Sequence, residues 1–281
     1  MSCELALDDI VTEFLLKTCR LCPRSKSKHA IEAAVRCVSC VVRPEVEDTE
    51  LSHILLTTGS VAEFYIEPML PYISDIDLMC HRNTQLAIPR GHPPPTQLPA
   101  EFHSNVKVHE IIDSDFPGYV YLGLRYLLTE CSDDDQYNAI EYDRRFIWVF
   151  ASQYSSSSMP MAEIHGPAVT YRQNESKFLP FDTVLCVRCL SWPLQAADWP
   201  TRHRNYGWPD SATLDRVVSS GCDVVRVAHH QCRQHEVMGK YQHRLSFSRA
   251  EIVLVNSWMP VQQIVYHMLR YFMKTERLVT D

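Results

Sequence analysis

The residues best suited to chemistry lie in one stretch, LLTTGSVAEFYIEPMLPYISDIDLMC, at residues 55 to 80. Asp75 and Asp77 alternate with apolar residues, which is typical of a strand, so both carboxylates should point to the same face. Two carboxylates about 4 Å apart repel by roughly 4 kcal/mol at an effective dielectric near 20. A pair of Mg²⁺ or Mn²⁺ ions removes that cost and supports phosphoryl transfer. The alternative is a turn followed by two solvated aspartates.

A Gly-Ser pair precedes the two aspartates by 15 residues. Gly59 lets the backbone approach a ligand closely, and the amides and hydroxyl around Ser60 can bind phosphate oxygens. Such pairs also occur in ordinary turns, but together with the downstream Asp-x-Asp this one predicts a nucleoside triphosphate site.

The surrounding patterns predict the elements that position these residues. We expect strands in SDIDLMCH, GYVYLGLRYLLT and DTVLCVRCLSW, and a proline-rich loop over residues 89–99. Helices are predicted over residues 5–20 and 27–43, from Asp210 or Ser211 to Gly221, and from Phe247 onward. The predicted fold class is therefore α+β, with a mixed, twisted sheet flanked by helices and a helical C-terminal lobe.

Four stretches together resemble a known family: TTGSVAEFYIEP with SDIDLM, HGPAVTY, FDTVLCVRCLSWPLQAADWPTRHRNYGWP and HRLSFSRAEIVLV. They look like the signature of the nucleotidyltransferase superfamily that contains cyclic GMP-AMP synthase, its invertebrate receptor relatives and the Mab-twenty-one proteins. The resemblance implies an N-terminal helical segment (1–45), a nucleotidyltransferase core (46–246) and the start of a helical C-terminal lobe (247–281).

The same resemblance implies roles for individual residues. Gly59 and Ser60 would hold ATP or GTP, and Asp75, Asp77 and Asp182 would bind Mg²⁺ or Mn²⁺. By position, Asp182 is similar to the third acid, which helps activate the attacking ribose hydroxyl, although a capped strand end remains the alternative. Arg244 resembles an arginine that contacts the base, since a planar guanidinium suits stacking, and Lys274 resembles a phosphate-contacting lysine.

Two departures from the family bear on activity. The spacing between Ser60 and Asp75 is somewhat long, and the sequence given ends at Asp281 before the aromatic SYHLKT-type segment that helps to stack a nucleobase. Either the sequence given is a fragment or shortened form, or one wall of the donor pocket is missing, and in the second case we expect little activity.

Composition restricts location and partners. The sequence has no apolar run long enough for a membrane span and no secretory signal, so we expect an intracellular protein, cytoplasmic or nuclear, with reduced cysteines. The net charge is −7, yet residues 17–43 hold seven basic residues and one acid. Double-stranded RNA or DNA could bind this basic segment through Arg20, Arg24, Lys26 and Lys28, although a solvated helix face is the alternative.

Two groups of cysteines and histidines have approximate zinc-ligand spacing. Cys19, Cys22, Cys37 and Cys40 form two C-x2-C pairs, but the second pair lies in an apolar helical pattern that favours core cysteines. His229, His230, Cys232 and His235 fit a polar loop better than a metal site. We therefore expect no structural zinc at either group.

Two functions from different classes fit these observations. One is a metal-dependent nucleotidyltransferase resembling the receptors of innate immunity that make a cyclic dinucleotide second messenger after sensing nucleic acid. The other is a catalytically silent binding or developmental scaffold of the Mab-twenty-one type.

Overall fold

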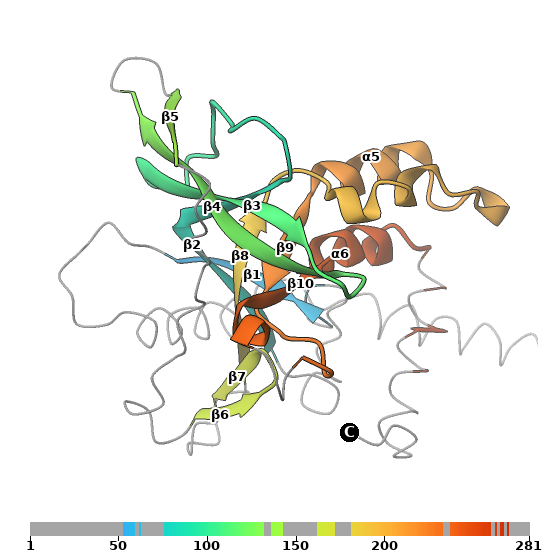
Figure 1. Ribbon diagram of the computed structural model, residues 1–281. Helices are drawn as coiled ribbons and strands as arrows, with labels where there is room; N and C mark the ends of the chain where they lie inside the picture. Colours follow the sequence, from blue (N-terminus) through green and yellow to red (C-terminus); the bar gives the residue numbers. More distant parts are fainter. Residues whose placement is uncertain are drawn as a thin grey trace, which may run out of the picture.

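A computed structural model describes the parts of the chain that build a large mixed β-sheet (Figure 1). It describes residues 53–59, 62, 76–131, 136–142, 162–171, 181–232, 237–259, 262, 265, 266 and 269. The strands are β1 (His53–Thr58), β2 (Ile76–Pro89), β3 (Asn105–Asp113), β4 (Tyr119–Glu130), β5 (Tyr137–Glu141), β6 (Ala162–His165), β7 (Ala168–Tyr171), β8 (Phe181–Cys189), β9 (Cys222–Val225) and β10 (Gln242–Ser246).

Six of these strands close into a ring. The sheet runs in the order β1-β2-β3-β4-β10-β9-β8-β7-β6, and an additional pairing of β2 with β8 joins the ends of its central part. The β2–β3 and β2–β8 pairings are parallel, whereas the other pairings are antiparallel. Strand β2 pairs with β1 up to Arg82 and with β3 from Gln85 along one edge. On its other edge, the register with β8 shifts between His81 and Leu86.

The inner face of the ring is the main hydrophobic core. Each of the six strands contributes small or branched side chains to one buried cluster: Ala87, Ile111, Val120, Leu122, Val187, Cys189, Cys222, Val224 and Leu245. Because side chains alternate across a strand, the neighbouring residues point to the outer face. On β8 the outer residues are Asp182, Val184, Cys186 and Arg188.

Two short α-helices pack together beside this sheet (Figure 1). Helix α5 (Ser211–Ser219) is capped by Asp210, whose carboxylate accepts a hydrogen bond of 2.7 Å from the Thr213 amide. Gly221 follows this helix with a φ of +61°, which favours glycine. Helix α6 (Ser248–Asn256) contacts β9 and β1. The 3-10 turns are η3 (Leu194–Ala196), η4 (Trp199–Thr201), η5 (Asn205–Gly207) and η6 (Val237–Tyr241).

The expected mixed sheet is confirmed, and the strands predicted around residues 76, 119 and 181 are present as β2, β4 and β8. The helix after Asp210 and the helical start near Phe247 are also present. Strands β1, β3, β5, β6, β7, β9 and β10 were not predicted. The closed ring was not foreseen either, because closure depends on pairing between segments about 100 residues apart.

The predicted N-terminal helices, and therefore the basic segment, lie outside the described residues. None of the helices in the described part of the chain is long and apolar enough to cross a membrane.

Two histidines lie on the inner face with the core. His109 and His243 are each 2% exposed. Burial, together with the nearby His243 and Lys107, lowers the pKa of His109 to about 3. Burial also lowers the pKa of His243 to about 4, although its ring Nδ1 donates to the Tyr241 carbonyl at 2.8 Å. Both rings are therefore neutral in the folded protein at pH 7.

We predict that these histidines make the protein acid-sensitive. Their folded pKa values lie below the unfolded value near 6.5, so the unfolded state binds more protons as the pH falls from about 6.5 to 4. The free energy of unfolding should therefore fall, by up to about 1.4 kcal/mol per pH unit for each histidine. Urea unfolding at a series of pH values measures this slope.

The dependence of the free energy of unfolding on pH should weaken in His109→Leu and in His243→Leu. It should be unchanged in the control His203→Leu, whose side chain is exposed. An unchanged slope in both core variants would contradict the assignment.

Candidate active site

The structure places Asp77 and Asp182 directly opposite each other on neighbouring parallel strands, β2 and β8. Register partners on adjacent strands point to the same face, and their backbones are about 4.8 Å apart. The row continues across the sheet through Thr58 of β1, opposite Asp77, and Thr170 of β7, opposite Asp182. Two carboxylates from segments 105 positions apart in sequence are thus flanked by two buried threonines.

Gly59 lies against the Asp77 carboxylate. It directly follows β1 and has a φ of +63°, a conformation that favours glycine. A Cβ atom at this position would overlap Asp77 Oδ2 and lie 3.0 Å from Asp77 Cγ. The absence of a side chain at residue 59 therefore lets the end of β1 lie against the Asp77 carboxylate.

The Asp182 carboxylate has the features of a metal ligand. Its Oδ1 atom is buried and has no hydrogen-bond partner among the residues that the structure describes. A buried carboxylate oxygen without a donor is costly. A second carboxylate on the adjacent strand adds repulsion of about 3 kcal/mol at 5 Å and an effective dielectric near 20. A divalent cation between the two carboxylates would offset both costs, so the residues present fit Mg²⁺ or Mn²⁺.

Arg244 lies in β10, where it pairs with Val225 of β9 and Tyr119 of β4. Its side chain is exposed. Val225 in turn pairs with Cys186 of β8, so alternation places Arg244 on the same outer face as Asp182. The guanidinium is therefore available on the face of the sheet that holds the two carboxylates.

The other site residues predicted from the sequence lie outside the described residues. These are Ser60, Asp75, Lys274 and the basic residues Arg20, Arg24, Lys26 and Lys28, together with the two N-terminal C-x2-C pairs. In the second cysteine and histidine group, the His229 ring stacks on Phe116 at 4.1 Å, and Cys232 is buried. His235 is not described.

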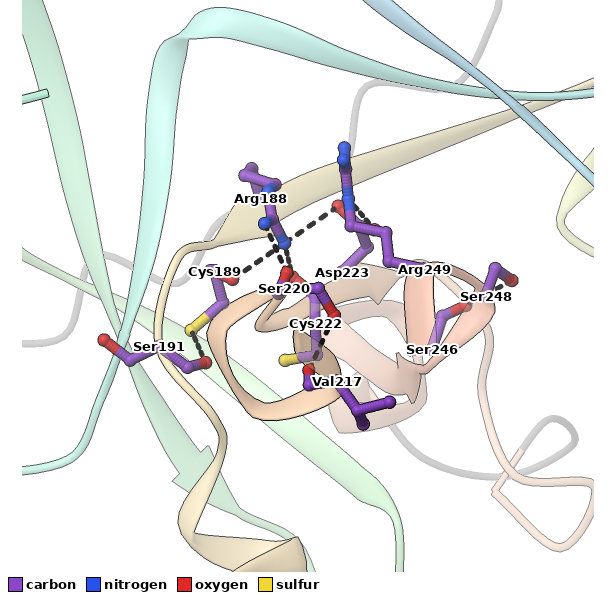
Figure 2. Close-up of polar contacts among 10 residues, drawn as sticks. All are labelled: Arg188, Cys189, Ser191, Val217, Ser220, Cys222, Asp223, Ser246, Ser248 and Arg249. Carbon is purple, nitrogen blue, oxygen red and sulfur yellow. Dashed lines mark hydrogen bonds and ion pairs between the residues drawn. The ribbon is translucent and has the colours of Figure 1, made fainter. Parts of the chain in front are cut away.

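One charged network on the outer face was not predicted. Arg188, Asp223 and Arg249 come together from β8, β9 and α6 (Figure 2). Neighbouring acids and bases on different elements produce no local sequence pattern. The only local signal is a single charged residue among apolar neighbours, Arg188 in VLCVRC and Asp223 in CDVV.

Comparison with known proteins finds a family model that matches part of the chain. Residues 127–257 match the model of the Mab-21 protein nucleotidyltransferase domain. The match includes β8 with Asp182, β10 with Arg244 and all of α6. No curated protein matches the chain significantly.

We predict that the acidic pair destabilises the protein when no divalent ion is present. Asp182→Asn removes one charge and retains the side-chain shape, so the midpoint of thermal unfolding in EDTA should rise by several degrees. Adding Mn²⁺ should raise the midpoint of the unchanged protein more than that of the variant.

The control is Asp115→Asn, since Asp115 is exposed on the turn between β3 and β4. A midpoint for Asp182→Asn at or below that of the unchanged protein in EDTA would argue against repulsion between the two carboxylates.

Proposed function

We propose that this protein is a metal-dependent nucleotidyltransferase acting on ATP or GTP, because residues 127–257 match the model of the Mab-21 protein nucleotidyltransferase domain. The observation that carries the proposal is the pairing of Asp77 with Asp182 beside Gly59. The two carboxylates and the glycine come from three separate segments, and each fits one requirement of nucleotidyl transfer: charge neutralisation, activation of a hydroxyl and binding of phosphates.

Asp77 and Asp182, with Asp75 two residues before Asp77, are the groups proposed to hold Mg²⁺ or Mn²⁺. When bound, these ions would neutralise the triphosphate and the negative charge that develops during transfer. The turn at Gly59 and Ser60 would bind the phosphates through backbone amides and the serine hydroxyl. A glycine is required there because any side chain would displace the Asp77 carboxylate.

Asp182 Oδ1 is proposed to accept the proton of the attacking ribose hydroxyl. This oxygen is buried and has no donor among the described residues, so it is available as an acceptor. In the transfer, the hydroxyl oxygen forms a bond to the α-phosphorus, the bond from that phosphorus to pyrophosphate breaks, and the proton moves to Asp182.

The proposed contact with the nucleobase and the proposed product rest on the resemblance to the nucleotidyltransferase superfamily. Arg244 is exposed on the outer face and offers a planar guanidinium on which a nucleobase can stack. Lys274 is proposed to contact phosphate. We propose a cyclic dinucleotide as the product, made after double-stranded RNA or DNA binds the basic segment at residues 17–43.

Purified protein incubated with labelled ATP and GTP, Mn²⁺ or Mg²⁺, and duplex RNA or DNA should form a linked nucleotide product. We predict that Asp182→Asn and Gly59→Ala each lower the rate at least about 100-fold, the first by loss of the proton acceptor and the second by displacement of Asp77. Separation of the labelled nucleotides by chromatography measures the product.

Asp115→Asn should retain the rate, because Asp115 is exposed on the far turn of β3 and β4. No product with either metal and any duplex would favour the catalytically silent scaffold.

Charge reversal tests the proposed activator site. Arg24→Glu with Lys28→Glu should weaken duplex binding and reduce its salt dependence, because each phosphate contact contributes about −0.9 to the slope of log K against log salt. The control is Arg90→Glu with Lys107→Glu, which makes the same charge change at exposed positions of the sheet. Equal binding by both double variants would exclude the basic segment as the duplex site.

A further inference from the structure

A second group of possible metal ligands lies on the outer face, apart from the acidic pair. His81, Cys186 and Asp223 each offer one ligand atom, and these atoms lie within 4.8 Å of one another. The residues come from β2, β8 and β9: His81 pairs directly with Cys186, and Asp223 lies two residues before Val225, the partner of Cys186. Three adjacent strands therefore bring an imidazole, a thiol and a carboxylate to one point.

This group is shielded from water. His81 is 2% exposed, Cys186 is 8% exposed and Asp223 is fully buried. Met79, Val225, Leu56 and Val184 pack with Cys186 in one hydrophobic cluster. Buried ionisable groups are rare in such surroundings, and they usually pair with each other or bind metal.

Asp223 retains one carboxylate oxygen for a further ligand. Its Oδ2 accepts a 3.0 Å hydrogen bond from Arg249 Nε, whereas its buried Oδ1 has no hydrogen-bond partner within the described part of the chain. Arg188 Nη1 lies 4.0 Å from Oδ1. Burial raises the pKa of the Asp223 carboxyl, and the two arginines oppose that rise.

The Arg188 guanidinium instead donates its hydrogen bonds to backbone carbonyls. Its Nη1 donates to the Cys222 and Cys189 carbonyls at 2.8 and 2.9 Å, and its Nη2 donates to the Ser220 carbonyl (Figure 2). These bonds hold the turn between α5 and β9 against the end of β8. They also hold Arg188 too far away to donate a hydrogen bond to Asp223, which leaves Oδ1 as an acceptor without a donor.

We propose that His81, Cys186 and Asp223 form a zinc site that joins β2, β8 and β9. One imidazole nitrogen, one thiolate and one carboxylate oxygen are a borderline-soft set that suits Zn²⁺ better than Mg²⁺ or Mn²⁺. Zinc takes four ligands at about 2.0 to 2.3 Å, so the three side chains must move slightly inward, and a water molecule completes the shell. Arg249 on Oδ2 then orients the Asp223 ligand.

Binding requires the loss of one proton. Burial and the neighbouring Asp223 raise the pKa of Cys186 well above its usual value, so the thiol is protonated without metal. When zinc binds, the sulfur-to-zinc bond forms and the thiol proton passes to solvent, and zinc affinity therefore rises with pH.

This site is separate from the acidic pair. His81 and Cys186 each lie four residues along their strands from Asp77 and Asp182, a distance of about 13 Å in an extended strand. Zinc here would reinforce the β2–β8 pairing that holds the two aspartates together. The inference does not depend on the proposed transferase activity.

The test uses the full chain with Cys19→Ser and Cys37→Ser, because this background removes one thiol from each N-terminal C-x2-C pair. Protein purified without chelator should contain about one zinc per chain by elemental mass spectrometry. Replacement by Co²⁺ should produce the thiolate-to-cobalt charge-transfer absorption and the strong visible bands of a four-coordinate ion.

In the same background, Cys186→Ser should lose the charge-transfer band, and Asp223→Asn should reduce zinc retention at least about tenfold, as loss of a ligand oxygen requires. Two control variants should retain both the zinc and the charge-transfer band. One is Cys131→Ser, which changes a half-buried cysteine after β4, and the other is Asp182→Asn at the acidic pair. Circular dichroism of each variant confirms folding.

Absence of both zinc and the cobalt band in the folded background protein would overturn the proposal. So would a charge-transfer band that persists in Cys186→Ser, because the thiolate would then come from another cysteine. If Asp182→Asn instead removes the zinc, the metal belongs to the acidic pair and the proposed site is wrong, whatever the transferase assay gives.

Discussion

The parallel pairing of β2 with β8 is the constraint on which the rest of the structure depends. It closes six strands around the hydrophobic core, and the same register sets Asp77 opposite Asp182. A shift of one residue would send one of the two carboxylates to the inner face among Ile111, Leu122 and Val224, where a charge cannot be solvated. The packing of the core therefore enforces the geometry of the acidic pair.

The outer face near this pairing contains two acidic positions, the buried Asp223 and the half-buried Asp182, whose charge is balanced differently. Asp223 has Arg249 and Arg188 nearby, so two protein cations offset part of its charge. For Asp182, the structure describes no ion pair, and Asp77 lies opposite it. The arginines around Asp223 therefore stabilise its charge within the protein. The carboxylates of Asp77 and Asp182 instead repel each other, and a bound cation would relieve that repulsion. That contrast distinguishes the candidate active site from the surrounding polar residues.

Sequence patterns predicted the local features well. The alternation in SDIDLMCH and DTVLCVRC predicted the strands β2 and β8, and Asp210 and Gly221 marked the two ends of α5. Strand β9 was missed because all four of its residues are buried, so it shows no alternation of polar and apolar residues. Strands β6 and β7 are four residues each, too short for a periodic signal.

The order of residue types along the chain determined the family resemblance, the strands that hold Asp77 and Asp182, and the glycine at position 59. These features are local, because alternation and turn chemistry act over a few residues. Only the tertiary structure decided that β2 and β8 are neighbours in register, that a side chain at Gly59 would overlap Asp77, and that His81, Cys186 and Asp223 converge. Those contacts join segments far apart in the chain, and long-range pairing is selected by the closure and packing of the whole core rather than by any local sequence pattern.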